Sequence, residues 1–157
     1  MSRNGEVNQS DYQALAEFRY QIRRFLRFSE HAARSTGIEP QQHQLMLAVK
    51  GLPEGTSATI SELAERLQIQ HHSTVELVDR LVTRGFVTRK RGSEDRRQVL
   101  VQLTAKGEKL LRDLAIHHRD ELKSAGADLV VALRKLMSSL GRPPAKAAKK
   151  SSAARKS

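Results

Sequence analysis

Apolar positions recur at helical spacing near the start of the chain. The first stripe has the 3.6-residue period of an amphipathic helix and consists of Tyr12, Leu15, Phe18, Ile22, Phe25 and Leu26. Ser10 and Asp11 before it are both favourable N-caps, so we expect a helix over residues 10–35. A second helix is predicted over residues 40–51, because Pro40 suits the first helical position.

Two short helices follow, separated by a brief turn. Thr59 and Glu62 have the spacing of a capping box, in which each side chain bonds the backbone N–H of the other residue. The second short helix is predicted over residues 72–84, with Gly85 as its C-terminal stop. We expect its inner face to be Val75, Val78, Leu81 and Val82. Two helices joined this closely form a helix-turn-helix unit.

The period then changes from 3.6 to 2. Residues 86–90 and 98–103 are rich in β-branched side chains and alternate as strands do, and a charged tip lies between them. A hairpin directly after a recognition-type helix is a wing. The sequence therefore predicts a mainly α fold with a small β-hairpin wing, which is a winged helix-turn-helix.

Two more helices are expected after the wing. Thr104 can cap the first, and Gly126 is expected to interrupt it. The last helix would then carry the stripe Leu129, Val130, Leu133, Leu136, Met137 and Leu140. Residues 1–9 are expected to be flexible. Residues 141–157 hold too little apolar surface to offset the entropy of ordering and are expected to be disordered.

Composition excludes several classes of protein. The 157 residues suffice for one domain, and the absence of Cys excludes disulfide scaffolds, Cys-ligated zinc fingers and thiol-based sensing. The longest apolar run is residues 129–133, whereas a membrane span needs roughly 20 residues. The N-terminus lacks the apolar stretch of a signal peptide, so we expect a cytoplasmic protein.

The charge of the chain narrows the kind of partner. Lys and Arg number 28 against 17 Asp and Glu, which gives a net charge of +11. The last seventeen residues hold six bases and no acid, so the rest of the chain is also basic. Such an excess favours a polyanionic partner, either a nucleic acid or an anionic membrane surface.

The exposed face of the second short helix is small and polar enough to enter a major groove. We expect this face to comprise His71, His72, Ser73, Thr74, Glu76, Leu77, Arg80 and Arg84. The wing would contact a minor groove through Arg89, Lys90, Arg91, Asp95, Arg96 and Arg97. Asp95 and Arg97 could pair there and hold the shape of the tip. The competing interpretations are a solvated helix and an ordinary charged hairpin.

Several short motifs occur in the order and spacing of one known family. They are Glu62-Leu63-Ala64, Val78-Asp79-Arg80-Leu81, Arg84-Gly85, Asp95-x-Arg97 and Leu103-Thr104-x-x-Gly107. In these motifs the chain resembles the multiple-antibiotic-resistance-regulator (MarR) family of bacterial transcription factors, over about residues 10–140. It departs from the family at Gln70, a weaker N-cap than the usual small residue, and in its basic tail.

The resemblance implies a homodimer that reads a palindrome in double-stranded DNA and is released by a small, often aromatic, effector. Residues 10–51 and 105–140 would form the helical dimerisation region, and residues 52–104 the winged helix-turn-helix. Within the wing, Asp95 and Arg97 would support the structure, and Arg96 or Arg97 would reach the minor groove. The dimer interface would use Tyr12, Leu15, Leu122, Leu129, Leu133, Leu136, Met137 and Leu140.

Ligand and metal candidates are fewer. An effector cavity beside the first helix would involve Phe18, Arg23, His43 and Met46, although a solvated face also explains the arginines of that helix. The adjacent pairs His71-His72 and His117-His118 point about 100° apart on a helix, so we expect no metal and no cofactor. His117 and His118 are expected in a dimer-side or pocket wall.

These observations together predict a dimeric, ligand-responsive repressor associated with the nucleoid. The alternative is an architectural nucleoid-associated protein of broad specificity. We expect no enzyme, because the sequence shows no nucleophile–base set, paired carboxylates or Gly-rich phosphate loop. The tail would act as a polycationic arm. Its Gly141-Arg142-Pro143 resembles an AT-hook core without the leading Arg, and a merely solubilising tail is the third interpretation.

Overall fold

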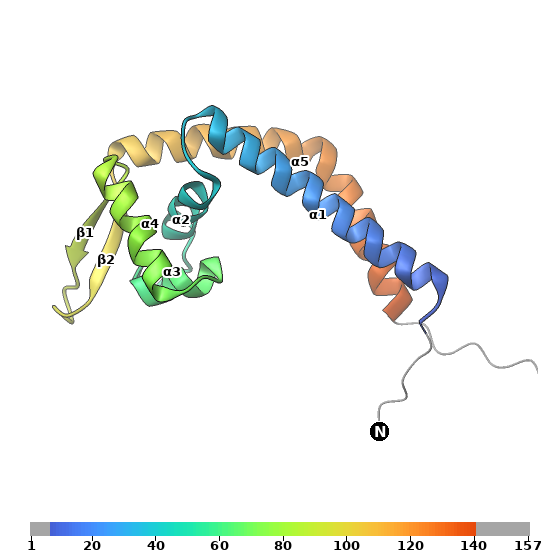
Figure 1. The fold of residues 1–157 in the computed structure, drawn as a ribbon, viewed down its shortest axis with the longest axis horizontal. Coiled ribbons are helices and arrows are strands. Elements are labelled where there is room, and N and C mark those ends of the chain that lie inside the picture. The colour runs from blue at the N-terminus through green and yellow to red at the C-terminus, as the bar shows by residue number, and fades with distance from the viewer. Residues whose placement is uncertain (1–6, 141–157) are drawn as a thin grey trace, which may run out of the picture.

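The computed structural model describes residues 7–140, which form a helical arm and a winged-helix lobe (Figure 1). The arm consists of α1 and α5, which pack along each other, and the lobe contains the other elements. Their bounds are α1 Gln9–Ser35, α2 Pro40–Lys50, α3 Ile60–Leu67, α4 His71–Thr83, β1 Val87–Arg91, β2 Val99–Leu103 and α5 Ala105–Leu140. The mainly α fold with a hairpin wing is confirmed. The predicted tail and the first six residues lie outside the described residues.

The start of α1 corrects one expectation. Its N-cap is Asn8, whose side chain accepts hydrogen bonds from the N–H groups of Ser10 and Asp11. The Asp11 carboxylate accepts the N–H of Asn8 in return, which completes a capping box. Ser10 and Asp11 therefore lie inside the helix, and Asp11 takes the acceptor role of the third helical position.

The start of α3 matches only half of its predicted capping box. The Thr59 hydroxyl accepts the N–H of Glu62, as expected. The Glu62 carboxylate, however, pairs with the Nε of Arg66 at 2.8 Å, one helical turn further on. Thr59 thus caps the helix alone, and Glu62 serves as the first member of an i,i+4 ion pair.

The helix after the wing is continuous, and the predicted break at Gly126 is wrong. A single α5 runs for 36 residues from Ala105 to Leu140. Glycine weakens a helix but, unlike proline, keeps the backbone N–H that the helix needs. Thr104 caps α5 as predicted, since its hydroxyl accepts the N–H of Gly107.

The core lies where α2, α3, α4, the hairpin and the first part of α5 meet. Its fully buried side chains include Leu45, Met46, Leu63, Leu81, Val101 and Leu114. The strands pair antiparallel, with Val87 opposite Leu103 and Arg91 opposite Val99. The loop before α3 adds a bridge between Thr59 and Leu100 at the outer side of β2. This packing fixes the wing against the rest of the lobe.

No helix within residues 7–140 combines the length and the apolar character that crossing a membrane requires.

Candidate DNA interface

Helix α4 presents a polar face at the end of the molecule opposite the free ends of the arm (Figure 1). The exposed residues of this face are His71, His72, Glu76 and Arg80, and Ser73 is half-buried beside them. Gln70 occupies the N-cap without making a side-chain capping bond. The first turn of α4 therefore keeps uncapped N–H groups, which favour an anion such as a DNA phosphate.

Two residues predicted on this face point into the core instead. Thr74 is fully buried, and its hydroxyl donates to the carbonyl of Gln70 at 3.1 Å. Leu77 is also buried. Val75 and Val82, predicted for the inner face, are only half-buried. The helix is thus rotated from the predicted orientation, because Thr74, Leu77, Val78 and Leu81 are its buried residues.

Arg84, which the sequence predicts as a DNA contact, is engaged within the molecule. One guanidinium nitrogen donates to the side-chain oxygen of Gln42 at 2.9 Å, and another donates to the carbonyl of Gly37 at 2.7 Å. The guanidinium also lies over the ring of Phe86, 5.2 Å from its centroid. Arg84 therefore anchors the end of α4 to the α1–α2 connection.

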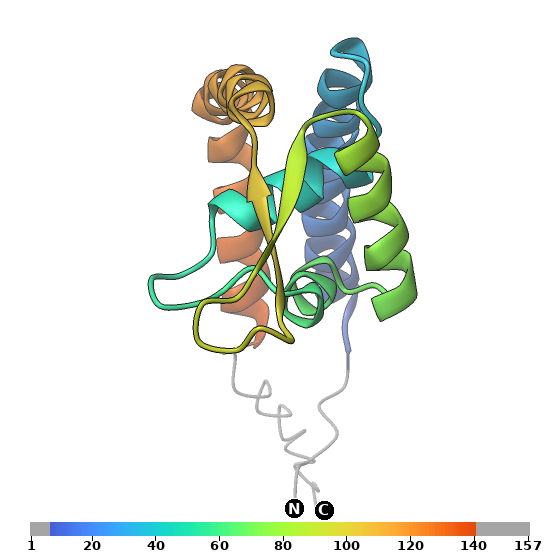
Figure 2. The same cartoon turned by 90° about the vertical axis from the view of Figure 1, so that its left-hand side faces the viewer.

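The base of the wing is tied to α4. Arg89 on β1 forms an ion pair with Asp79, so this predicted DNA contact is engaged within the lobe. The remaining basic residues of the wing are exposed, and they form no ion pair within the described part of the chain: Lys90, Arg91, Arg96 and Arg97. Four cations are therefore available at the end of β1 and at the tip of the wing, and Figure 2 shows the course of this hairpin.

Asp95 shapes the tip in a way that differs from the predicted ion pair. Its carboxylate accepts the backbone N–H of Arg97 at 2.9 Å, and its carbonyl accepts the N–H of Gln98. Gly92 then donates its N–H to the carbonyl of Gln98. Asp95 thus holds the turn through the backbone, which leaves the guanidinium of Arg97 free to reach outward.

Several apolar side chains of the arm are exposed to solvent. Of the predicted dimer residues, five are exposed: Tyr12, Leu15, Leu122, Leu133 and Met137. Leu129 and Leu136 are half-buried, and the side chain of Leu140 lies outside the described residues. Leu26, Val130 and Val131 are exposed as well. The sequence predicts Leu26 only as part of an apolar stripe, because the period of a helix does not tell whether an apolar residue faces the core or a partner.

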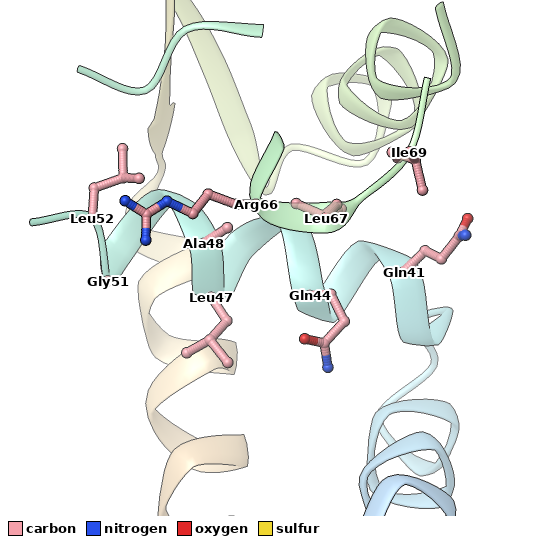
Figure 3. A pocket seen from close by; sticks show the side chains of 9 residues that line it. All are labelled: Gln41, Gln44, Leu47, Ala48, Gly51, Leu52, Arg66, Leu67 and Ile69. Carbon is pink, nitrogen blue, oxygen red and sulfur yellow. The ribbon is translucent and has the colours of Figure 1, made fainter. Parts of the chain in front are cut away.

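The four residues predicted to line an effector cavity are not among those that line the groove between α2 and α3. His43 and Met46 are buried within the core, Phe18 is half-buried on α1, and Arg23 is exposed. The groove between α2 and α3 has a volume of about 510 Å³, and the Arg66 side chain extends there toward Leu52 (Figure 3). Its lining is Gln41, Gln44, Leu47, Ala48, Gly51, Leu52, Arg66, Leu67 and Ile69.

The histidine pairs are split between surface and interior. His71, His72 and His117 are exposed, whereas His118 packs inward against α1 and α2. Residues 7–140 contain no group of three His, Asp or Glu side chains placed to hold a metal ion.

Comparison with known proteins identifies the lobe. A family model described as MarR family matches residues 36–98. The HTH-type transcriptional regulator YfiV of Bacillus subtilis is 40% identical over 75 residues, which cover 48% of this chain and 44% of that protein. The organic hydroperoxide resistance transcriptional regulator of the same organism is 34% identical over 70 residues, or 45% of this chain and 47% of that protein. The chain thus matches less than half the length of each of these relatives.

Solved structures extend the likeness to the arm. AbsC, a MarR family transcriptional regulator from Streptomyces coelicolor, superposes with a TM-score of 0.69 at 20% identity, over 89% of this chain and 94% of AbsC. The transcriptional repressor CouR, solved on a 23-mer DNA duplex, gives a TM-score of 0.60 at 26% identity, over 87% of this chain and 99% of CouR. The family model, the curated relatives and the solved structures agree: the chain is similar to MarR family regulators in sequence over the lobe and in fold over the arm and the lobe.

Proposed function

We propose that this chain is a dimeric, sequence-specific repressor of transcription, with α4 in the major groove and the wing in the minor groove. The observation that carries the proposal is the pairing of two surfaces at one end of the lobe. These are the polar face of α4, with its uncapped first turn, and a wing whose exposed cations are Lys90, Arg91, Arg96 and Arg97. A repressor of this kind would act on chromosomal DNA in the cytoplasm.

The apolar side chains of the arm support a two-fold dimer. Leu133 and Met137 lie on α5 with 42% and 59% of their surface exposed, and Tyr12 on α1 is 59% exposed. Large apolar side chains exposed together on two packed helices indicate an interaction site. A two-fold axis through the arms would present two copies of α4, which matches a palindrome with half-sites about 34–36 Å apart. We include a small aromatic effector in the proposal only because the chain resembles the MarR family.

Substitutions that remove contacts to bases and substitutions that remove contacts to phosphates should have different effects in a selection experiment. Ser73→Ala combined with Glu76→Ala removes two groups that can bond base edges, and should change base preference by about 1–3 kcal/mol per contact. Arg96→Ala should instead weaken binding to all sequences and lower the salt slope by about one unit. Selection from a random-sequence DNA library, followed by titration at several salt concentrations, measures both.

The matched control for Arg96→Ala is Arg119→Ala, which removes the same charge from an exposed position on α5. It should leave the salt slope nearly unchanged. Identical selected motifs for the wild type and the Ser73/Glu76 double variant would contradict the role of α4. A library that yields no motif at all would favour the architectural DNA-binding protein over the repressor.

The tail is expected to add affinity without specificity. Residues 141–157 hold six bases, no acid and no aromatic side chain, and counterion release by such a segment is independent of base sequence. Truncation after Leu140 should lower the affinity for the selected palindrome and for random duplex together, and should flatten the salt slope. An unchanged slope would show that the tail only aids solubility. A fall in specificity would restore the AT-hook interpretation.

A further inference from the structure

A buried histidine on α2 lacks a partner for one ring nitrogen. His43 is 3% exposed, and its Nδ1 has no hydrogen-bond partner among the described residues. A neutral imidazole can leave a nitrogen unpaired at a modest cost, whereas an imidazolium would carry an unpaired N–H and a charge in the core. The site is therefore built for the neutral ring.

The ring of His118 on α5 lies next to it, with the two centroids 5.1 Å apart. Nδ1 of His118 lies 2.7 Å from the carbonyl of Leu114, and Nε2 lies 2.8 Å from the hydroxyl of Ser29 on α1. A carbonyl can only accept, so Nδ1 of His118 carries a proton and donates it to the carbonyl of Leu114. Phe25 and Phe28 of α1 meet the His118 ring edge-on. We call His43, His118, Ser29, Phe25 and Phe28 the histidine cluster.

The histidine cluster stands where the arm joins the lobe. Ser29 and the two phenylalanines belong to α1, His118 belongs to α5, and His43 belongs to α2, the lobe helix that contacts both. Whatever loosens His43 from His118 therefore loosens the lobe from the arm. Since the arm carries the proposed dimer interface, this joint would set the positions of the two α4 helices on DNA.

We propose that the histidine cluster is a proton-sensitive joint, which holds α2 against α1 and α5 while His43 is neutral and releases it when the ring takes up a proton. The inference rests on the proposed function, because the regulated property is DNA binding by the same domain.

Electrostatics supports this direction. Burial first, and the charge of His118 second, lower the pKa of His43 from 6.5 to about 4. Glu30 on α1, Arg84 on α4 and Arg119 on α5 are exposed, and the half-buried charged side chains of the helices are Asp11, Glu62, Glu108 and Glu121. The buried side chains of α3, α4 and β2 are aliphatic except Thr74. No buried carboxylate among the described residues therefore offsets a charge on His43.

The size of the effect follows from proton linkage. In the released state His43 is solvated and regains its ordinary pKa near 6.5, while in the closed state it stays neutral down to about 4. Protons therefore favour the released state below pH 6.5. Lowering the pH from 7.5 to 5.5 should raise the ratio of released to closed protein about tenfold.

Hydrogen exchange of the α2 amides in the full-length protein measures this ratio. After correction for the intrinsic rate, the wild type should lose about tenfold protection in α2 between pH 7.5 and 5.5, and His43→Leu should lose less than twofold. His117→Leu removes an exposed histidine from α5 and should behave as the wild type does. An equal loss of protection in the wild type and in His43→Leu would contradict the proposal that protonation of His43 releases α2.

Bound DNA provides the reciprocal test. The palindrome selected at pH 7.5 should restore α2 protection at pH 5.5, because a ligand of the closed state must oppose proton uptake. Bound DNA that leaves α2 unprotected would overturn the proposed regulation. Failure to bind any palindrome would refute the proposed function, while exchange in the free protein would still test the joint.

A second measurement does not depend on the folding of a variant. The His43 ring resonances of the wild type on the selected palindrome should show a neutral imidazole at pH 5.5. A protonated His43 ring in that complex would also overturn the proposal.

Discussion

Leu133→Asp should convert the protein from a dimer to a monomer and lower its affinity for the selected palindrome by about 100-fold or more. Leu133 is 42% exposed on α5 among other apolar side chains of the arm. In a two-fold dimer the substitution places one carboxylate from each subunit in the same apolar interface, which disfavours association. A monomer then binds only one half-site and loses the gain in affinity that comes from binding two linked half-sites. Light scattering at micromolar concentration gives the mass, and fluorescence anisotropy gives the affinity.

Ser138→Asp is the matched control. It introduces the same charge five residues further along α5, about 140° around the helix from Leu133, at an exposed position. It should leave the mass and the affinity unchanged. A wild-type protein that scatters light as a monomer would rule out the dimer, and a Leu133→Asp variant that stays dimeric would place the interface elsewhere.

Gly107→Ala should destabilise the fold by about 3 kcal/mol, because it overpacks the junction between the wing and α5. Gly107 is buried in the first turn of α5, and a Cβ there would overlap the carbonyl oxygen of Phe86. That oxygen also accepts the N–H of Thr104, so it cannot move without breaking the start of the helix. Thermal unfolding should show a midpoint lowered by roughly 10 °C.

Gly126→Ala makes the same substitution in the same helix and serves as the control. A Cβ at Gly126 would meet the Leu122 side chain at 3.8 Å, which is an ordinary contact. Alanine should therefore stabilise the helix slightly, by up to about 1 kcal/mol. Equal unfolding midpoints for the two variants would contradict the crowding at Gly107, and a large loss at Gly126 would contradict the continuous α5.

Local signals in the sequence were enough for the order of the elements. Pro40 at the start of α2, Thr59 before α3 and the change to a period of 2 after Gly85 each act through neighbours in the chain. Such signals do not depend on the rest of the fold. The lobe was therefore predicted with its helices in order and its wing in place.

Features that depend on distant contacts were predicted less well. Arg84 is five residues from Asp79 in the chain, but its partners Gln42 and Gly37 are more than forty residues away. The rotation of α4 that buries Thr74 is set by the packing of α2 and α3, and a period of 3.6 residues tolerates a shift of one position. The groove beside Arg66 arises from tertiary packing that periodicity does not encode.

The uninterrupted α5 connects the wing to the far end of the arm through one continuous, curved helix (Figure 1). Thirty-six residues at 1.5 Å each give a helix of about 54 Å, which starts at the wing and ends beside the N-terminal part of α1. A tilt of about 5° at the far end of such a helix would displace the near end by roughly the length of one base-pair step. A small change in how two arms cross would thus be magnified into a mismatch between the two recognition helices and their half-sites.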